Sequence, residues 1–142
     1  MTESYRPSPT DWVAKHVTDI EGSGDTAAAS VQGMNVVLMT MKGRKSGDTL
    51  KVPVMRVEHE GVYAAVASKG GAPKHPAWYF NLAADPNITL QDGPRTWDVR
   101  AREIDGAERE EWWPLCVEAF PPYADYEKKT DRKIPVFLLE PR

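Results

Sequence analysis

The sequence lacks most of the features that assign a small protein to a common class. Its 142 residues include one cysteine, Cys116, which cannot form an internal disulfide, and this is typical of proteins in a reducing cytoplasm. No apolar run approaches the roughly 18 residues of a membrane span, and the polar start from Met1 to Pro9 has no signal-peptide pattern. The formal net charge of −3 argues against a general nucleic-acid surface. We therefore expect a cytoplasmic protein that does not bind nucleic acid.

Common catalytic and metal-binding motifs are also missing. The chain contains no GxSxG, HExxH, GxxxxGK[ST] or GxGxxG pattern. Its three histidines, His16, His59 and His75, do not have the spacing of metal ligands, so we expect no metal site. Cys116 falls on the apolar face of a predicted helix, where it is expected to be inert core. If the protein is an enzyme, these absences favour chemistry carried by an organic cofactor.

Six segments have the composition or alternation of β-strands, namely 35–41, 50–58, 62–67, 87–91, 95–104 and 134–139. Most are joined by short turns, which predicts a mainly β, α+β domain with a small antiparallel barrel and helices packed outside it. Pro53 removes a hydrogen-bond donor from its strand, so it should lie at an edge, at a bulge or beside a ligand. Nothing divides the chain, so residues 1–142 are expected to form one domain, with the barrel over about 34–142.

Helical periodicity and capping residues predict three helical regions. The first covers about 9–21, and the second opens at Pro76 and ends near residue 84. The third follows Asp105, which is expected to cap it, and Pro114 should kink it or split it in two. The proline-rich segment 120–126 is expected to be irregular, with its aromatic side chains lining a pocket or covering the barrel end.

Two basic, glycine-rich loops are the strongest functional signals. In Gly43–Gly47 the glycines and Ser46 would let backbone amides approach an anion, although the strand pattern alone favours a solvated hairpin tip. The loop from Ser68 to Gly71 follows a buried strand and precedes a helix, where helix N-termini attract negative charge. This second loop is too rich in glycine to suggest a packing role, and we favour anion binding over a simple strand-to-helix turn.

The chain closely resembles the deazaflavin-dependent nitroreductase family of actinobacteria from Trp12 to its C-terminus. The resemblance lies in several long motifs that occur in one order: Gly43–Gly47, Val66–Tyr79, Asn81-Leu82, Asp85-Pro86, Tyr123–Tyr126 and Lys129–Val136. It implies the split β-barrel fold of flavin-mononucleotide-binding oxidoreductases, with six antiparallel strands and peripheral helices. It also implies coenzyme F420, a 5-deazaflavin with a phosphate and a polyglutamate tail.

The resemblance implies a role for each motif residue. The phosphate side of the cofactor would be held by Arg44, Lys45, Ser46, Gly47 and Lys51. The deazaflavin ring would be bordered by Pro53, Met55, Val66, Ala67, Ser68, Lys69, Gly70, Gly71 and Ala72, and the site closed by Lys74, His75, Trp78 and Tyr79. The acceptor would face Phe120, Tyr123 and Tyr126, and some family members carry tyrosine at the position of Phe120. Catalysis would involve Ser68, Lys69, Tyr123 and Tyr126, with Ser68 or a tyrosine donating a hydrogen bond to the acceptor.

These observations predict a reductase that transfers a hydride from reduced F420 to an electron-poor planar acceptor, such as a quinone or a nitro-aromatic compound. One alternative is an enzyme that uses flavin mononucleotide on the same fold. A second is a non-catalytic carrier of F420. The motifs are compatible with a monomer or a homodimer. The Trp12 helix would pack on the barrel or, for a lipid-soluble quinone, contact a membrane surface.

Overall fold

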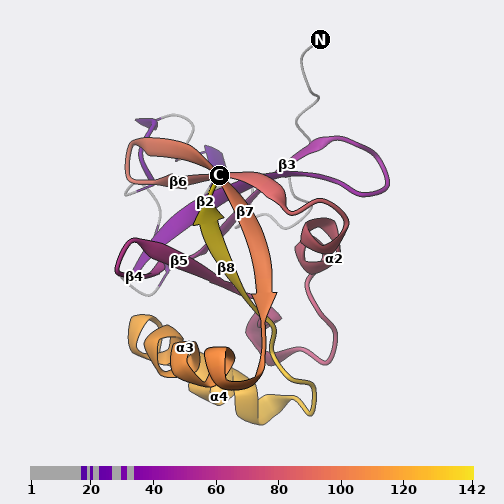
Figure 1. Cartoon of the computed structure of the whole chain (residues 1–142), viewed down its shortest axis with the longest axis vertical. Helices are drawn as coiled ribbons and strands as arrows, with labels where there is room; N and C mark the ends of the chain where they lie inside the picture. The colour runs from indigo at the N-terminus through magenta and orange to yellow at the C-terminus, as the bar shows by residue number, and fades with distance from the viewer. Residues whose placement is uncertain (1–16, 19, 21–22, 27–29, 32–33) are drawn as a thin grey trace.

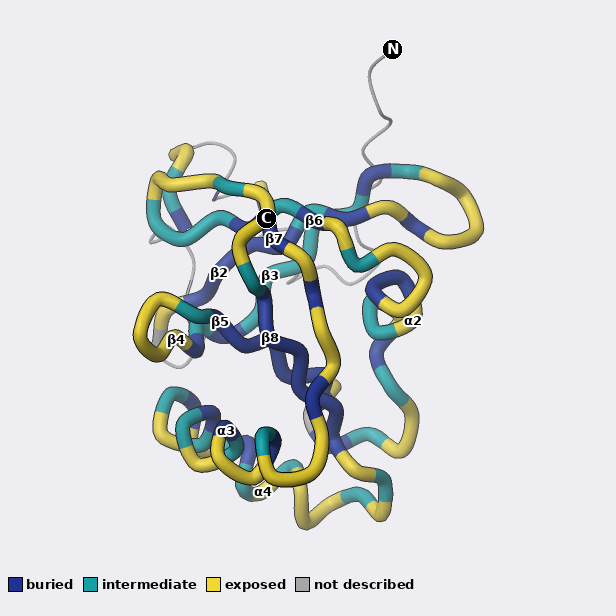
Figure 2. The backbone as a smooth tube through the Cα atoms, viewed as in Figure 1, coloured by how far each residue is buried: buried dark blue, intermediate teal, exposed yellow. Residues whose placement is uncertain are grey.

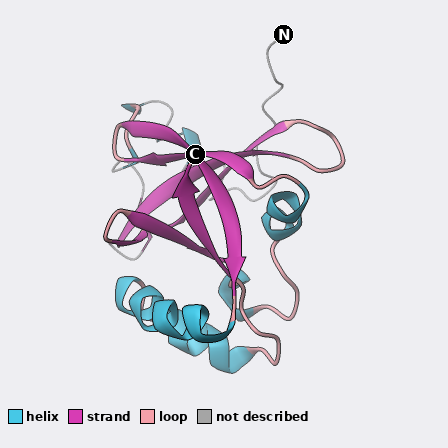
Figure 3. Ribbon diagram, viewed as in Figure 1, coloured by secondary structure: helices cyan, strands magenta, loops and turns pink. Residues whose placement is uncertain are grey.

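The computed structural model describes residues 17–18, 20, 23–26, 30–31 and 34–142. These residues form one curled antiparallel sheet with helices at its side and at one end (Figure 1, Figure 3). Most of the helix predicted over 9–21, including Trp12, lies outside the described residues. Residues 17, 18 and 20 of that range are helical, and Val17 and Ile20 are buried in the core.

The six predicted strands are confirmed, and because one of them divides in two they form seven of the eight strands of the sheet. The strands are β1 (Ser30–Val31), β2 (Met34–Lys42), β3 (Thr49–Met55), β4 (Val57–His59), β5 (Val62–Val66), β6 (Asn87–Asp92), β7 (Arg95–Ile104) and β8 (Val136–Pro141). The short strand β1 was not predicted, and the segment predicted as one strand over 50–58 divides into β3 and β4 at Arg56.

The division at Arg56 explains how the sheet curls into a barrel. Strand β3 pairs with β2, whereas β4, directly after Arg56, pairs with β5 at the other end of the strand order. The Arg56 amide donates a hydrogen bond to the Asn35 carbonyl at 3.0 Å, which anchors the bend. Among the described strands β3 has β2 as its sole ladder partner, so Pro53 lies on an edge strand, as predicted.

Several strands are buried on both faces, and their alternating residues belong to two hydrophobic clusters. The inner cluster fills the barrel with residues such as Met39, Ala65 and Phe137. The outer cluster contains residues such as Leu38 and Leu138, which pack beneath the C-terminal helices. Figure 2 shows the buried strands between the exposed loops and helices. Burial on both faces explains the nearly continuous apolar composition of β2, β5 and β8.

The helices are the 3₁₀ turn η2 (Lys69–Gly71), α2 (Ala77–Ala84), α3 (Gly106–Ala119) and α4 (Pro122–Lys129). Helix α3 runs through Pro114 without ending, so the predicted division into two helices is wrong. Pro114 is exposed, and water can therefore bind the carbonyl that proline leaves without a donor. Asp105 occupies the N-cap position of α3, but its side chain makes no capping hydrogen bond. Cys116 is buried in α3 as predicted, and burial raises the pKa of its thiol to about 12.

The segment predicted to be irregular after Phe120 is the helix α4. Its prolines do not prevent this, because Pro121 is the N-cap residue and Pro122 is the first helical residue. The amide that proline lacks would have no helical partner at these positions. The aromatic residues of the segment therefore lie on a regular helix that packs against α3.

Candidate functional site

The basic loop Gly43–Gly47 forms the tip of the β2–β3 hairpin and is fastened to α2. The Arg44 amide and its Nη1 donate hydrogen bonds to Asn81 Oδ1 at 3.1 and 3.0 Å. Arg44 Nη1 also lies 3.4 Å from the Ala77 carbonyl oxygen, and its guanidinium lies 5.2 Å from the centre of the Phe80 ring. Arg44 is therefore held against the helix, whereas residues 45–47 remain exposed at the tip of the hairpin.

The groups of this loop that remain available suit an anion. The Gly47 amide donates to the Gly43 carbonyl at 2.9 Å, and the Asp48 amide donates to Ser46 Oγ at 3.1 Å. The amides of Lys45 and Ser46, by contrast, have no partner among the described residues, and both residues are exposed. Two adjacent unpaired amides beside a lysine are the donors that a phosphate group needs.

The second loop follows β5 and leads into α2, so both loops reach the same helix (Figure 1). Ser68 is only 8% exposed, and its hydroxyl has no partner within the part of the chain that the structure describes. Lys69 is exposed and has a φ of 48°. This left-handed backbone conformation is uncommon for residues other than glycine. A buried hydroxyl without a protein partner is the group here that most directly fits a bound ligand.

Gly71 has a packing role, contrary to the prediction that this loop is too rich in glycine to pack. It is buried, its φ is 82°, and its amide donates to the Ser68 carbonyl at 3.0 Å. A Cβ atom here would lie 2.9 Å from the Tyr126 carbonyl oxygen and 3.0 Å from Lys129 Cβ. Glycine therefore allows η2 to approach α4 closely, and the amides of Gly71 and Ala72 are used within the turn.

Arg132 holds this loop from the connection between α4 and β8. It donates to the carbonyls of Ser68 at 2.7 Å, Ala72 at 2.9 Å and Ala67 at 3.2 Å. Its Nη1 also lies 3.0 Å from His75 Nδ1. Sequence reasoning gave Arg132 no role, although it lies in one of the motifs that carry the family resemblance.

His75 belongs to an aromatic cluster and does not cap α2, since no side chain makes that capping hydrogen bond. Its ring stacks on Tyr79 with 4.3 Å between ring centres. Burial and then the charge of Arg132 lower the pKa of His75, while Glu103 opposes the shift. The Tyr79 hydroxyl donates to Glu103 at 2.9 Å. Trp78 is half-buried and packs near Phe137, with 6.2 Å between ring centres.

The residues predicted to wall the ring lie on β3 and at the end of β5, two strands that contact each other without pairing. Lys51 and Pro53 are half-buried, whereas Met55, Val66 and Ala67 are buried. Lys74 is exposed next to His75. The structure thus brings the two loops, α2 and the β3 edge into one region, but Met55, Val66 and Ala67 present little free surface.

The predicted acceptor residues lie on and beside α4. Phe120 and Tyr123 are each 3% exposed and belong to the outer hydrophobic cluster, with 5.0 Å between their ring centres. Two alternatives were predicted for these aromatic side chains, namely lining a pocket or covering the barrel end. Their burial favours the second alternative. Burial raises the pKa of the Tyr123 phenol, which keeps it neutral. Tyr126 is partly exposed, and its backbone touches Gly71.

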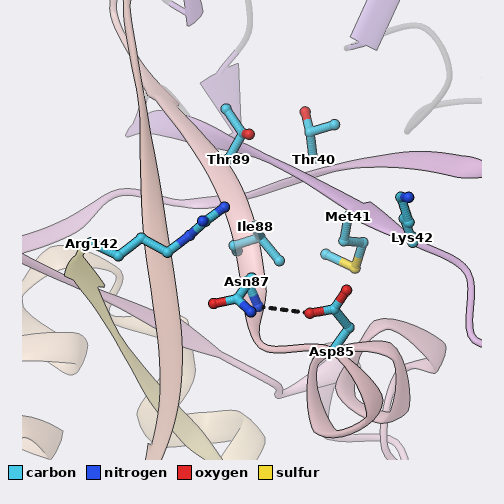
Figure 4. Close-up of a pocket in the computed structure, with 8 residues that line it drawn as sticks. All are labelled: Thr40, Met41, Lys42, Asp85, Asn87, Ile88, Thr89 and Arg142. Carbon is cyan, nitrogen blue, oxygen red and sulfur yellow. Dashed lines mark hydrogen bonds between the residues drawn. The ribbon is translucent and has the colours of Figure 1, made fainter. Parts of the chain in front are cut away.

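A separate shallow hollow lies where β2 and β6 meet the end of α2 (Figure 4). It is lined by Thr40, Met41, Lys42, Asp85, Asn87, Ile88, Thr89 and Arg142. Its volume of about 160 Å³ is below the roughly 300 Å³ of small ligand pockets, and it contains none of the predicted site residues. The described residues also contain no group of three or more histidine, cysteine, aspartate or glutamate side chains placed to hold a metal ion.

Comparison with known families gives a match over nearly the whole chain. Residues 12–141 match the model of a family described as F420H(2)-dependent quinone reductase. A Mycobacterium tuberculosis protein named F420H(2)-dependent quinone reductase is 30% identical over 109 residues, which cover 75% of this chain and 73% of that protein. No helix in the described part of the chain has the length and apolar composition to cross a membrane.

Two solved structures are more similar in sequence. One, described as an F420-H2 dependent reductase (FDR-A), is 59% identical with a TM-score of 0.70, and covers 74% of this chain and 93% of its own. The other, described as a domain-swapped dimer, is 54% identical with a TM-score of 0.74, and covers 94% of this chain and 100% of its own. The fold of this chain is therefore that of the split-barrel reductases.

Proposed function

Because the chain belongs to the F420H(2)-dependent quinone reductase family, we propose that it binds reduced coenzyme F420 and transfers a hydride to a quinone. The observation that carries this proposal is the convergence of the two loops on α2. Arg44 fastens one loop to the helix through Asn81, and the other loop continues directly into it. Nitro-aromatic compounds are a plausible second class of acceptor, because they too are planar and electron-poor.

The free groups around this region fit the proposed cofactor. The amides of Lys45 and Ser46 and the exposed ammonium groups of Lys45 and Lys74 would hold its phosphate. The unpartnered Ser68 hydroxyl would border its ring. These basic groups stand out on a chain whose net charge is −3, and they give the site a local positive potential.

When bound in its reduced form, the deazaflavin supplies the hydride. The protein then has to position the acceptor and stabilise the negative charge that develops on it. The β3 edge and the Ser68 loop would fix the acceptor against the ring and exclude water, because contact distance and orientation control hydride transfer. The Ser68 hydroxyl would donate a hydrogen bond to the oxygen on which negative charge develops. Solvent would then supply the proton, and no strong base of the protein is needed. Lys69 would add a positive charge beside that oxygen.

Tyr126 is the acceptor-facing tyrosine that we retain in this proposal. It is partly exposed, and its backbone lies against Gly71, which places this residue beside the proposed cofactor loop. Phe120 and Tyr123 would support Tyr126 from beneath, with 6.2 and 6.1 Å between the ring centres. Access of an acceptor to Phe120 or Tyr123 would require α4 to move.

A relative described as a domain-swapped dimer also supports self-association of this chain. Sedimentation velocity over a range of protein concentrations would separate a stable dimer from a monomer.

The test of the proposed function is a binding and turnover experiment with the purified full chain. Oxidised F420 is fluorescent, and we expect micromolar or tighter binding in a titration. Lys45→Ala should weaken that binding, whereas Lys128→Ala, which removes another exposed lysine, on α4, should not. Mixing with reduced F420 and a soluble naphthoquinone should then oxidise the cofactor.

Other results would select the alternatives. Tight binding of F420 without reduction of any quinone or nitro compound would favour a carrier. Protein that is yellow as isolated and has a flavin spectrum would favour flavin mononucleotide. The absence of F420 binding at micromolar concentration would contradict the proposal.

A further inference from the structure

We propose that Arg132 is a positioning residue of this site: its guanidinium holds residues 67–75 in the conformation that receives the cofactor and fixes His75 with Nδ1 as a hydrogen-bond acceptor. The part of the proposal that concerns the cofactor rests on the proposed function. The part that concerns the loop and His75 applies to the ligand-free protein.

One guanidinium spans the whole loop. Arg132 Nη1 reaches the Ala67 carbonyl at its start, Nη2 reaches the Ser68 carbonyl, and Nε reaches the Ala72 carbonyl beyond the turn. Ala67 and Ser68 are buried, so water cannot readily replace these bonds. Three donors on a rigid, planar group therefore fix the two ends of the turn relative to each other.

The turn between these ends has few restraints of its own. Its internal hydrogen bonds run from the Gly71 amide to Ser68 and from the Ala72 amide to Lys69, at 3.0 and 3.1 Å. Two of its residues, Lys69 and Gly71, have left-handed φ values of 48° and 82°. Such a conformation persists when surrounding contacts over-determine it. The close packing of Gly71 against α4 restrains the middle of the turn, and we infer that the bonds from Arg132 restrain its two ends and so set the position of the Ser68 hydroxyl.

The contact with His75 defines the chemical state of the imidazole. A guanidinium can only donate hydrogen bonds, so Nδ1, which lies 3.0 Å from Arg132 Nη1, has to be the unprotonated nitrogen. The ring proton is then on Nε2, and the ring is neutral. The ring stacks on Tyr79, whose hydroxyl donates a hydrogen bond to Glu103, and it also lies near Phe80, with 6.0 Å between ring centres. His75 thus enters the site as a neutral donor through Nε2.

The guanidinium of Arg132 is hydrogen-bonded to neutral groups among the described residues, and no carboxylate neutralises its charge there. Its partners within the described residues are three carbonyl oxygens and an imidazole nitrogen, and none is a carboxylate. A net positive charge therefore remains directly behind the proposed cofactor loop. Lysine would keep this charge but could not reach Ala67, Ser68 and Ala72 together, because its donors share one nitrogen atom.

The test compares Arg132→Lys with wild type. The matched control is Arg142→Lys, since Arg142 also donates to a backbone carbonyl, that of Val99 at 3.1 Å, and its ion-pair partner among the described residues is Asp98 on β7. In the ligand-free protein, Arg132→Lys should speed amide hydrogen exchange in residues 69–76 and leave exchange in β6 and β7 unchanged. Its affinity for oxidised F420 should fall about ten- to hundredfold, which is the cost of losing charged hydrogen bonds to a buried loop.

Two further readouts separate positioning from general stability. Ring ¹⁵N shifts should place the proton of His75 on Nε2 in wild type, and this tautomer preference should weaken in Arg132→Ala. Guanidinium ion at low, non-denaturing concentration should partly restore F420 binding to Arg132→Ala, and it should have no such effect on Arg142→Ala. If Arg132→Ala does not fold, Arg132→Lys decides the question.

Wild-type exchange and wild-type affinity in Arg132→Lys would overturn the proposal, as would a wild-type His75 with its proton on Nδ1. If wild-type protein fails to bind F420 at all, the proposed function is wrong. The loop-holding role is then judged by hydrogen exchange and by the His75 ring shifts of the ligand-free protein.

Discussion

The side-chain oxygen of Asn81 accepts two hydrogen bonds from Arg44, one from its backbone amide at 3.1 Å and one from Nη1 at 3.0 Å. Asn81 is only 4% exposed, so this pair lies between α2 and the tip of the β2–β3 hairpin. Arg44 therefore fastens the loop to α2. It leaves Lys45 and the neighbouring amides as the groups that can meet an anion.

Replacing Asn81 should therefore damage the loop and the fold together. Asn81→Ala removes both acceptor contacts, and the free energy of unfolding should fall by about 1–3 kcal/mol, as for the loss of buried hydrogen bonds that include a charged donor. Urea denaturation measures this change. Asn87→Ala, on the exposed start of β6, is the control and should cost less than about 0.5 kcal/mol. Equal costs for the two variants would show that the Asn81–Arg44 contact does not stabilise the protein.

The close approach of η2 to α4 can be tested with two glycines of similar conformation. Gly71 has a φ of 82° and a Cβ there would meet Tyr126, whereas Gly61 has a φ of 83° and nothing within 4 Å. Gly61→Ala should cost about 1–2 kcal/mol from the backbone conformation alone. Gly71→Ala should cost about 1–3 kcal/mol more, because α4 has to shift. The difference between the two unfolding free energies isolates the packing term, and a difference near zero would contradict it.

The fold was predictable where local pattern and tertiary packing agree. The strands around Leu38 and Leu138 are apolar and the strand around Val99 alternates, and each overlaps its predicted range, with β8 displaced by two residues. The helix α4 was missed because Pro121 and Pro122 suggest irregular chain, although proline is well suited to the start of a helix. The bend at Arg56 was missed because residues 50–58 have the pattern of one continuous strand, and only the pairing shows that β3 belongs with β2 and β4 with β5.

The parts of the candidate site that could be predicted are those whose residues are adjacent in the sequence. The two loops were identified from glycine and lysine clusters, and the structure brings both to α2. The roles of Arg132 and Asn81 could not be inferred, because each acts on a loop 37 or more residues away in the sequence. Sequence also could not show that Tyr123 is buried, since its pattern fits both a pocket wall and a core cluster.

A second polar contact, which is partly buried, lies near the Arg56 bend. The Tyr63 hydroxyl and Arg56 Nε both donate to Asp92 Oδ2, so the carboxylate links β5 and the bend to the end of β6. Tyr63→Phe should lower the free energy of unfolding by about 1.5–3 kcal/mol, which is typical of a lost hydrogen bond to a charged group.

The matched control for this variant is Tyr79→Phe, which also removes a tyrosine hydroxyl bonded to a carboxylate. The partner of Tyr79 is Glu103, and that hydrogen bond is exposed, so its loss should cost less than about 1 kcal/mol. Urea denaturation of both variants gives the comparison. A smaller cost for Tyr63→Phe than for Tyr79→Phe would mean that Asp92 does not anchor the bend.

The pKa of His75 makes stability depend on pH in a defined direction. Burial and the charge of Arg132 lower this pKa from the ordinary value of 6.5, with Glu103 opposing the shift. The unfolded chain therefore binds more protons than the folded chain between the lowered pKa and about 6.5. The contribution of His75 to stability should be fully present above about pH 6.5 and should be lost as the pH falls through that window.

His75→Asn isolates this effect, because an asparagine oxygen can accept the Arg132 hydrogen bond but does not titrate. Unfolding free energies of wild type and the variant, measured by urea denaturation from about pH 5.5 to pH 8, should converge toward low pH and separate toward high pH. The other titrating groups are common to both proteins, so the difference between the curves reports His75 alone. Curves that stay parallel would mean that His75 titrates alike in the folded and unfolded chains. The contact with Arg132 would then not hold the ring neutral.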